Sequence, residues 1–250
     1  MTNIPKLRVE DIRNQFAEEY RAENFVIDKT GVKLIELIGY SFEADSDSIF
    51  GEPNDDYIRR EINWYKSLSL NVNDIEAPVP KIWVDVSGEN GEINSNYGWC
   101  VGSDEFDNYH GRHNHGQYWA VYKELRDNPN SRRAVMIYTR PTMHKEFNAH
   151  GMGDFICTNV VQYLIRDDTL IAVVQMRSND AWAGYRNDFA WQRHVVKLLG
   201  AALGITQTKI IWHVGSLHLY ERNFYLVDHF AKTGEIHISK KDYERLYGVN

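Results

Sequence analysis

The strongest constraint on the fold is a pair of β-rich runs, 158–166 and 169–178, which are separated only by Asp167 and Asp168. Two such runs with a two-residue polar connection predict a β-hairpin. Cys157 stands directly before the first run, and Arg177 lies near the end of the second. We therefore expect regular structure to connect a potential nucleophile to a potential anion-binding side chain.

Helical and strand patterns are mixed around this hairpin, which indicates an α+β fold. Ile12, Phe16 and Tyr20 recur at a spacing of four and predict an amphipathic helix over 9–22. The polar stretch 103–117 interrupts the pattern and is interpreted as a surface insertion. The other expected elements are strands over 32–42, 134–139 and 209–215, and helices over 57–65, 188–203 and 221–233.

The composition indicates one domain and argues against DNA as a partner. A chain of 250 residues with 43% hydrophobic content can bury one substantial core, so we assign 1–250 to a single domain. The net charge of -7 provides no general field that would attract nucleic acid, so local arginines and lysines must bind any phosphate. A monomeric nucleotide is therefore the better candidate partner, and direct DNA binding is not expected.

Cysteine usage and hydropathy indicate an intracellular protein. Cys100 and Cys157 are the only cysteines and lie far apart in the sequence, which is not the pattern of a disulfide framework. Segment 1–25 is charged and lacks the apolar core of a signal peptide, and no segment approaches the ~20 apolar residues of a membrane span. We expect a cytoplasmic protein without a membrane partner.

A series of short motifs occurs in a fixed order along the chain: 28–31, 60–65, 81–83, 97–98, 128–133, 154–159, 177–180, 187–188 and 218–220. This order resembles the thymidylate synthase family over about 25–229, and it is most similar to the phage branch that hydroxymethylates deoxycytidylate. Segments 28–33, 91–98 and 238–243 carry the closer match. The resemblance implies a mixed β-sheet core flanked by helices, a homodimer formed through the sheet faces, and a viral enzyme in the host cytoplasm.

The resemblance implies covalent catalysis by Cys157. A thiolate that adds to C6 of a pyrimidine turns C5 into a nucleophile, and this chemistry requires thiolate rather than thiol. For a lone cysteine, a buried structural role would be the more common one. The surrounding motifs favour the nucleophile for Cys157, whereas Cys100 has no such support and is assigned a structural role.

Four basic side chains are candidate ligands of the nucleotide phosphate. By resemblance, Arg177, with Ser178 beside it, binds the phosphate within its own subunit, while Arg132 and Arg133 reach the site from the partner of the homodimer. Lys29 stands where thymidylate synthases usually carry arginine. The alternative for each is an exposed, solvated charge.

Two further polar groups are candidates for recognising the sugar and the base. His218 and Tyr220 alternate along an extended segment, and the resemblance implies hydrogen bonds to a sugar hydroxyl; a half-buried pair in a sheet is the alternative. Asp188 stands where synthases carry asparagine. A carboxyl group can accept from N4 of cytosine and, when protonated, donate to N3, so Asp188 favours dCMP over dUMP. The alternative for Asp188 is a helix N-cap.

Four more residues complete the predicted site by resemblance. Glu61 would organise water and proton transfer, and Tyr97 would help to remove the C5 proton. Asp180 and Trp83 would bind the pterin ring of the folate. The alternatives are a solvent-facing carboxylate for Glu61 and core packing for Tyr97.

The implied reaction converts dCMP, 5,10-methylenetetrahydrofolate and water to 5-hydroxymethyl-dCMP and tetrahydrofolate. Three features favour this reaction over methylation: Asp188, the Thr158-Asn159 pair after the nucleophile, and the C-terminal segment 247–250. The alternatives are a dUMP or CMP hydroxymethylase, a thymidylate synthase, or an inactive nucleotide- or RNA-binding homologue.

A metal site is not expected. His110, His113 and His115 lie in the polar stretch without a matching carboxylate or cysteine framework, which is a weak signal for a metal.

Overall fold

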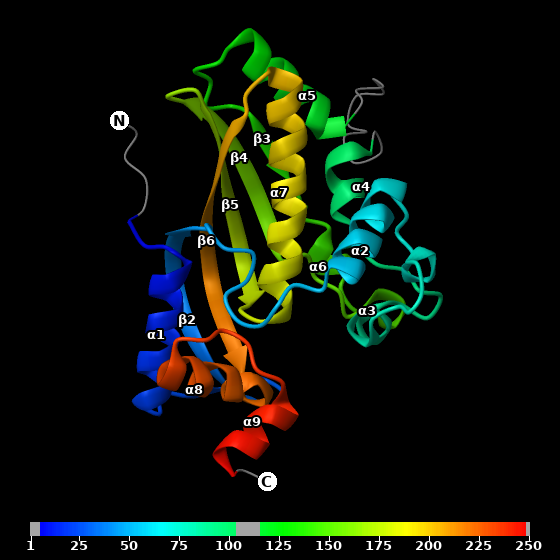
Figure 1. Cartoon of the computed structure of the whole chain (residues 1–250). Helices are drawn as coiled ribbons and strands as arrows, with labels where there is room; N and C mark the ends of the chain where they lie inside the picture. Colours follow the sequence, from blue (N-terminus) through cyan, green and yellow to red (C-terminus); the bar gives the residue numbers. More distant parts are fainter. Residues whose placement is uncertain (1–5, 104–115, 249–250) are drawn as a thin grey trace. The chain divides into compact units, whose positions relative to one another are not determined.

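The computed structural model describes residues 6–103 and 116–248, and within them the strands form one sheet in the order β1-β2-β6-β5-β4-β3 (Figure 1). The predicted α+β class with a mixed sheet is confirmed. The strands are β1 (Val26–Ile27), β2 (Lys33–Glu43), β3 (Val135–Ile137), β4 (Thr158–Arg166), β5 (Thr169–Asp180) and β6 (Gln207–Tyr220). The helices are α1 (Val9–Arg21), α2 (Asp55–Ser67), α3 (Lys81–Val86), α4 (Tyr97–Gly102), α5 (Gly116–Asp127), α6 (Met143–Glu146), α7 (Ala183–Leu203), α8 (Phe224–Thr233) and α9 (Lys240–Tyr247), with short 3-10 turns at η1 (Val72–Asp74), η3 (Ala149–Gly151) and η4 (Glu221–Asn223).

The described residues group into two compact units. The first unit comprises Met1–Pro53, Met176–Arg193 and Lys209–Asn250, and the second comprises Asn54–Gln175 and His194–Thr208. The assignment of 1–250 to one domain stays a prediction. In the described ranges, no helix is long and apolar enough to cross a membrane.

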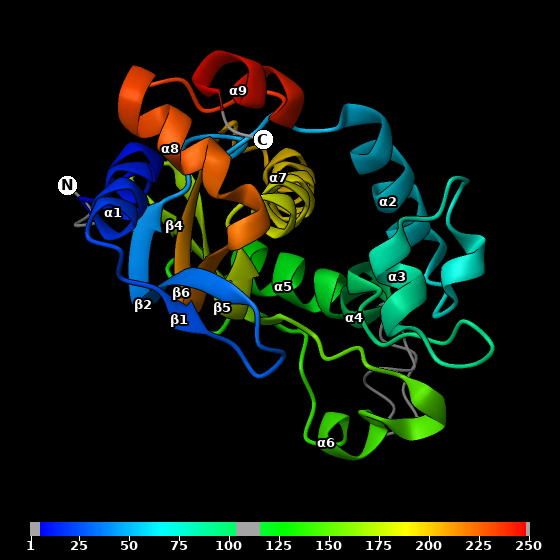
Figure 2. The ribbon, with the colours of Figure 1, turned by 90° about the horizontal axis from the view of Figure 1, so that it is seen from below.

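The first unit is built on the antiparallel pairing of β2 with β6, from Leu34 opposite Tyr220 to Glu43 opposite Ile211. The predicted helix over 9–22 is present as α1, whose apolar stripe Ile12 and Phe16 is fully buried. Helix α8 packs against both α1 and α9 (Figure 2). These contacts give the C-terminal part of the chain a fixed place within this unit.

The second unit contains β4 and the part of β5 up to Gln175, which form the predicted hairpin. Asp167 and Asp168 have φ values of 47° and 57°, the left-handed conformation that a two-residue hairpin turn requires. β3 pairs antiparallel with β4, and Met136, Val161 and Tyr163 are fully buried there. The hairpin prediction is therefore confirmed.

Helices α2 and α4 approach closely within the second unit because Gly98 has no side chain. A Cβ atom at Gly98 would lie 1.9 Å from the carbonyl oxygen of Tyr65. Asn96 caps α4 by accepting from the Trp99 N–H at 2.8 Å, and its amide donates to the carbonyls of Trp64 and Ser69. The start of α4, which carries Tyr97, is thus tied to the end of α2.

Candidate active site

Cys157 lies at the entrance to β4, in the second unit. Its side chain is half-buried, and its Sγ lies 3.8 Å from the carbonyl oxygen of Phe155. Cys100 is fully buried on α4, and burial raises the pKa of the Cys100 thiol to about 12. Of the two cysteines, Cys157 is therefore the one that a substrate can reach.

Glu61 is the centre of a buried hydrogen-bonded group on α2 and α3. The Tyr57 hydroxyl donates to Oε1 of Glu61, and Nε1 of Trp83 donates to Tyr57 Oη at 2.7 Å and to Glu61 Oε1 at 3.3 Å. Glu61 is only 4% exposed, so it is not the solvent-facing carboxylate that was the alternative. Burial raises the pKa of Glu61 to about 7, although the hydrogen bonds from Tyr57 and Trp83 act in the opposite direction.

Tyr97 begins α4 and is buried in an aromatic cluster. Its ring stacks on Tyr65 at a centroid distance of 5.4 Å and meets Tyr138 edge-on at 5.3 Å. This packing fixes the plane of the phenol ring. Core packing does not conflict with the predicted role of Tyr97 in proton removal, because Tyr65 and Tyr138 contact its ring and a hydroxyl group at the end of the ring can still take part in proton transfer.

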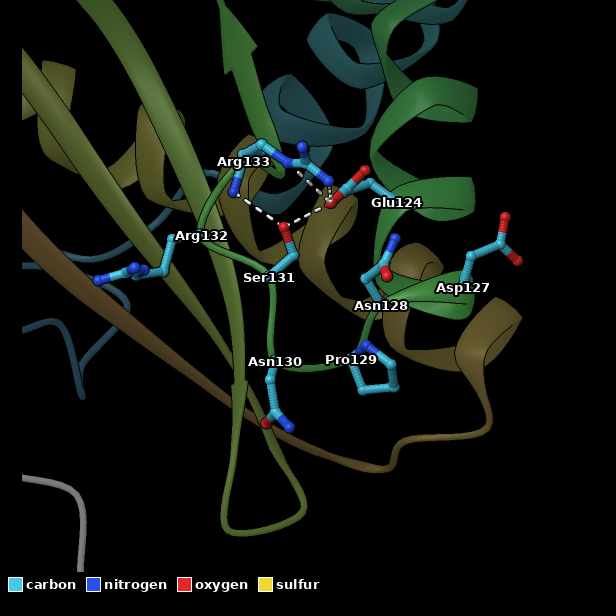
Figure 3. Close-up of a pocket in the computed structure, with 8 residues that line it drawn as sticks. All are labelled: Glu124, Asp127, Asn128, Pro129, Asn130, Ser131, Arg132 and Arg133. Carbon is cyan, nitrogen blue, oxygen red and sulfur yellow. Dashed lines mark hydrogen bonds and ion pairs between the residues drawn. The ribbon is translucent and has the colours of Figure 1, made fainter.

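Arg132 and Arg133 lie on the loop between α5 and β3, beside a pocket of about 570 Å³ lined by Glu124 and 127–133 (Figure 3). Arg133 pairs with Glu124 at 3.0 Å, and Ser131 donates to the same Glu124 oxygen at 2.5 Å. Hydrogen bonds from Ser131 and Arg133 lower the pKa of Glu124. The Arg132 side chain points away from Glu124 (Figure 3). Both arginines are exposed. Exposure is required by the prediction that they bind a phosphate in the partner subunit.

Asp188 lies within α7 of the first unit, not at its start. The helix begins at Ala183, five residues before Asp188, so the N-cap alternative for Asp188 is wrong. Its Oδ2 accepts a hydrogen bond of 2.7 Å from Nδ2 of Asn179, which is 3% exposed at the end of β5. A Cβ atom at Gly184 would lie 3.1 Å from Asn179 Nδ2 and 3.7 Å from Asp188 Oδ2, so glycine leaves room for this pair.

Asp180 stands just before α7 and interacts with His218 on β6. Oδ1 of Asp180 accepts from the Trp182 N–H at 2.9 Å, which closes a tight turn just before α7 begins at Ala183. Burial raises the pKa of the Asp180 carboxyl and lowers the pKa of His218, while their mutual attraction acts against both shifts. Tyr220 meets the His218 ring edge-on at 5.0 Å, and the Arg222 guanidinium lies 4.4 Å above the Tyr220 ring.

The remaining predicted phosphate ligands also lie in the first unit. Arg177 is exposed on β5, and Ser178 beside it is half-buried. Lys29 is exposed in the turn between β1 and β2, which Asp28 closes by accepting from the N–H groups of Thr30 and Val32 at 2.7 and 3.0 Å.

Two site residues, Tyr57 and Asn179, were not predicted from the sequence. Tyr57 precedes Glu61 by four residues on one helix, a spacing that places both side chains on the same face. Asn179 lies inside the motif 177–180, but its bond to Asp188 joins a strand to a helix and leaves no periodic signal.

No metal centre was found in the described part of the chain, where no three His, Cys, Asp or Glu side chains are grouped to hold an ion. His110, His113 and His115 lie outside the described residues.

Comparison with known proteins identifies the family. The thymidylate synthase family model matches residues 23–235. The deoxycytidylate 5-hydroxymethyltransferase of Enterobacteria phage T4 is 53% identical over 248 residues, covering 96% of this chain and 98% of that enzyme, and that of phage T6 is 53% identical over 95% and 96%. The thymidylate synthase of Fusobacterium nucleatum is 27% identical, over 79% of this chain and 70% of that enzyme. The solved structure of thymidylate synthase A from Bacillus subtilis shares the fold, with a TM-score of 0.68 at 17% identity, covering 90% of this chain and 84% of that one. The chain therefore belongs to the thymidylate synthase family.

Proposed function

We propose that the protein is a folate-dependent deoxycytidylate 5-hydroxymethyltransferase. It would convert dCMP, 5,10-methylenetetrahydrofolate and water to 5-hydroxymethyl-dCMP and tetrahydrofolate. The observation that carries this proposal is the 53% identity to the phage T4 enzyme of that name over 98% of its length. The thymidylate synthase from Fusobacterium nucleatum reaches 27%, which makes thymidylate synthesis the weaker alternative. A phage enzyme of this kind would act in the host cytoplasm.

In the proposed reaction, Cys157 supplies the nucleophile. Its thiolate adds to C6 of the cytosine ring, and the electron pair of the C5–C6 double bond then makes C5 nucleophilic. C5 bonds to the methylene carbon of methylenetetrahydrofolate and then loses its proton, and cleavage of the bond between that carbon and the folate nitrogen releases tetrahydrofolate and leaves an exocyclic methylene group on the ring. Water adds to the methylene carbon to form the hydroxymethyl group, and expulsion of the Cys157 thiolate from C6 restores the aromatic ring. The base that takes up the C5 proton acts before tetrahydrofolate leaves. Tyr97, whose ring is held by Tyr65 and Tyr138, would help to remove that proton.

Glu61 suits proton transfer and the placement of water. A carboxyl group with a pKa of about 7 exchanges its proton readily at neutral pH. The hydrogen bonds from Tyr57 and Trp83 both reach Oε1, so they orient the carboxyl group through one oxygen. This arrangement supports a role for Glu61 in delivering the water that distinguishes hydroxymethylation from methylation.

Asp188 would read the cytosine ring. Asn179 occupies Oδ2 as a donor, which orients the carboxyl group within α7. A carboxyl group so held can accept from the N4 amino group and, when it carries a proton, donate to N3. Uracil presents the opposite pattern at both positions, so it would be rejected.

The donor types in the chain fit the folate and the phosphate. A pterin ring offers N–H donors and a flat aromatic surface, which suit the Asp180 carboxyl and the Trp83 indole.

The phosphate would be bound within one subunit by Arg177, Ser178 and Lys29. The sugar would accept or donate hydrogen bonds with His218 and Tyr220. Arg132 and Arg133, both exposed, would reach the phosphate of the partner subunit in a homodimer.

The substrate assignment can be tested by replacing Asp188 with asparagine. An amide offers uracil the donor and acceptor that a carboxyl group offers cytosine, so the ratio of kcat/KM for dCMP to that for dUMP should fall about 100-fold or more. Asn187→Ala, which changes the preceding residue of the same helix, is the matched control and should keep the wild-type ratio. An unchanged ratio in Asp188→Asn would remove the basis for assigning dCMP.

A further inference from the structure

Asp154 is a buried carboxylate three residues before Cys157, in the second unit. It is 7% exposed, and both of its oxygens accept hydrogen bonds. Oδ2 accepts from the N–H groups of Asn94 at 2.9 Å and Ser95 at 2.8 Å, and Oδ1 accepts from the Ser95 hydroxyl at 2.7 Å. The donors stand two and three residues before Tyr97. One side chain therefore connects the segment that leads to the nucleophile with the segment that leads to Tyr97.

The Asp154 carboxyl group accepts from all three donors at once, two on Oδ2 and one on Oδ1. Hydrogen bonds to an ionised acceptor are roughly twice as strong as neutral ones, and burial strengthens them further. An asparagine could keep the two N–H groups on its one oxygen and donate from its NH2 group to the Ser95 hydroxyl oxygen, whereas an alanine would remove the acceptor of all three bonds. The connection therefore depends on the two oxygens of the Asp154 side chain.

The segment that Asp154 holds is fixed at other points as well. The Asn94 side-chain oxygen accepts from Arg140 Nη2 at 3.0 Å. Asn96 caps α4 and donates to two carbonyls near the end of α2. On the other side, Ile156 is fully buried next to Cys157. Asp154 thus joins two segments that are each anchored elsewhere in the unit.

We propose that Asp154 is a positioning residue that sets the placement of Cys157 relative to Tyr97. This inference rests on the proposed function, in which Cys157 attacks C6 and Tyr97 acts at C5. Those two carbon atoms are bonded to each other, so the two side chains must keep their separation to well under an ångström. A misplacement of about 1 Å can cost about 100-fold in rate. Asp154 does not touch the substrate in this account and acts only through the two segments.

The test is Asp154→Ala, which removes both acceptor oxygens. We expect kcat to fall about 10- to 100-fold, with KM for dCMP changed less than about threefold because the phosphate ligands are not attached to this contact. Alkylation of Cys157 by iodoacetamide, followed by peptide mass, should change in rate as well, since it reports the placement of the thiol without any turnover. Ser95→Ala removes one of the three bonds and should give a smaller loss. The double variant should lose less than the two single losses combined.

Gln117→Ala is the matched control. Gln117 also makes three hydrogen bonds in the second unit, accepting from the Ile137 N–H and donating to the carbonyls of Cys100 and Ile137 at 2.6 to 2.7 Å. These bonds reach Cys100 and Ile137 and leave the contact between Asp154 and 94–95 intact, so kcat and the alkylation of Cys157 should stay near wild type. If Asp154→Ala does not fold, Ser95→Ala carries the same comparison.

The inference is overturned if Asp154→Ala, or Ser95→Ala in its place, matches Gln117→Ala in both kcat and alkylation rate at an equal folded fraction. A wild-type protein that does not turn over dCMP would instead contradict the proposed function. The alkylation comparison would still decide whether Asp154 places Cys157.

Discussion

Replacing Glu61 with glutamine should stabilise the protein at alkaline pH and leave its stability almost unchanged at pH 4. The buried Glu61 carboxyl has a pKa of about 7, against 4.5 for the ordinary group, because burial disfavours its charge. Between these two values the folded chain keeps a proton that the unfolded chain has released. The free energy of unfolding therefore decreases as pH rises through this window, and it levels off above pH 7.

The size of the effect follows from the same two pKa values. A rise from 4.5 to about 7 corresponds to about 3 kcal/mol of lost stability once Glu61 is ionised in the folded protein. Glutamine keeps an Oε1 acceptor for Tyr57 and Trp83 but cannot ionise. The variant should therefore exceed wild type by up to about 3 kcal/mol at pH 8.5 and by almost nothing at pH 4.

Urea unfolding at the two pH values measures this difference. Tryptophan fluorescence is a suitable signal, because Trp83 bonds directly to Glu61 and Trp64 packs edge-on against Trp83 at 5.4 Å. Glu89→Gln, a change at an exposed carboxylate of the same unit, is the matched control and should follow the wild-type curve. A stability difference between Glu61→Gln and wild type that is the same at both pH values would refute the reasoning.

Two further predictions concern close packing and the proposed dimer. Gly98→Ala should destabilise the protein by about 3 kcal/mol or more in urea unfolding, because its Cβ atom would lie 1.9 Å from the Tyr65 carbonyl oxygen. Gly102→Ala on the same helix would meet only a leucine methyl group at 3.4 Å and should cost far less, so equal losses would contradict the packing argument. Mixing inactive Cys157→Ser with inactive Arg132→Ala should restore about a quarter of wild-type activity, since half of the dimers would be mixed and each would have one intact site. No recovery after subunit exchange would argue against a shared site.

The sequence predicted best where the signal was local. The hairpin of β4 and β5 was predicted because Asp167 and Asp168 form a polar two-residue connection, and both adopt the expected left-handed conformation. Helix α2 was predicted because its apolar stripe is regular, and Asn54 caps it by accepting from the Tyr57 N–H. In both cases one short segment contains all the information needed.

The predictions failed at boundaries that tertiary contacts decide. Helix α7 starts at Ala183 rather than Asp188, because Gly184 disfavours a helix locally but makes room for the bond between Asn179 and Asp188. Strand β6 continues past Gly215 to Tyr220. A Cβ atom at Gly215 would lie 2.9 Å from the Arg177 carbonyl oxygen, so this glycine permits a close approach rather than ending the strand.

The candidate site likewise contains residues that local motifs predict and residues that only tertiary contacts reveal. The family motifs directed attention to Cys157 and Glu61, but the partners of Glu61 depend on how α2 meets α3. Burial, which raises the pKa of Glu61, cannot be derived from a helical pattern alone. Residues that act through others, such as Asn179 and Asp154, are recognised only once their hydrogen bonds are known.

The central claim is tested most directly by incubating the protein with 5,10-methylenetetrahydrofolate and dCMP, with dUMP in a parallel reaction, and identifying the nucleotide and folate products by mass. The account predicts 5-hydroxymethyl-dCMP together with tetrahydrofolate, and little or no product from dUMP. A methylated nucleotide together with dihydrofolate, or a preference for dUMP, would contradict it.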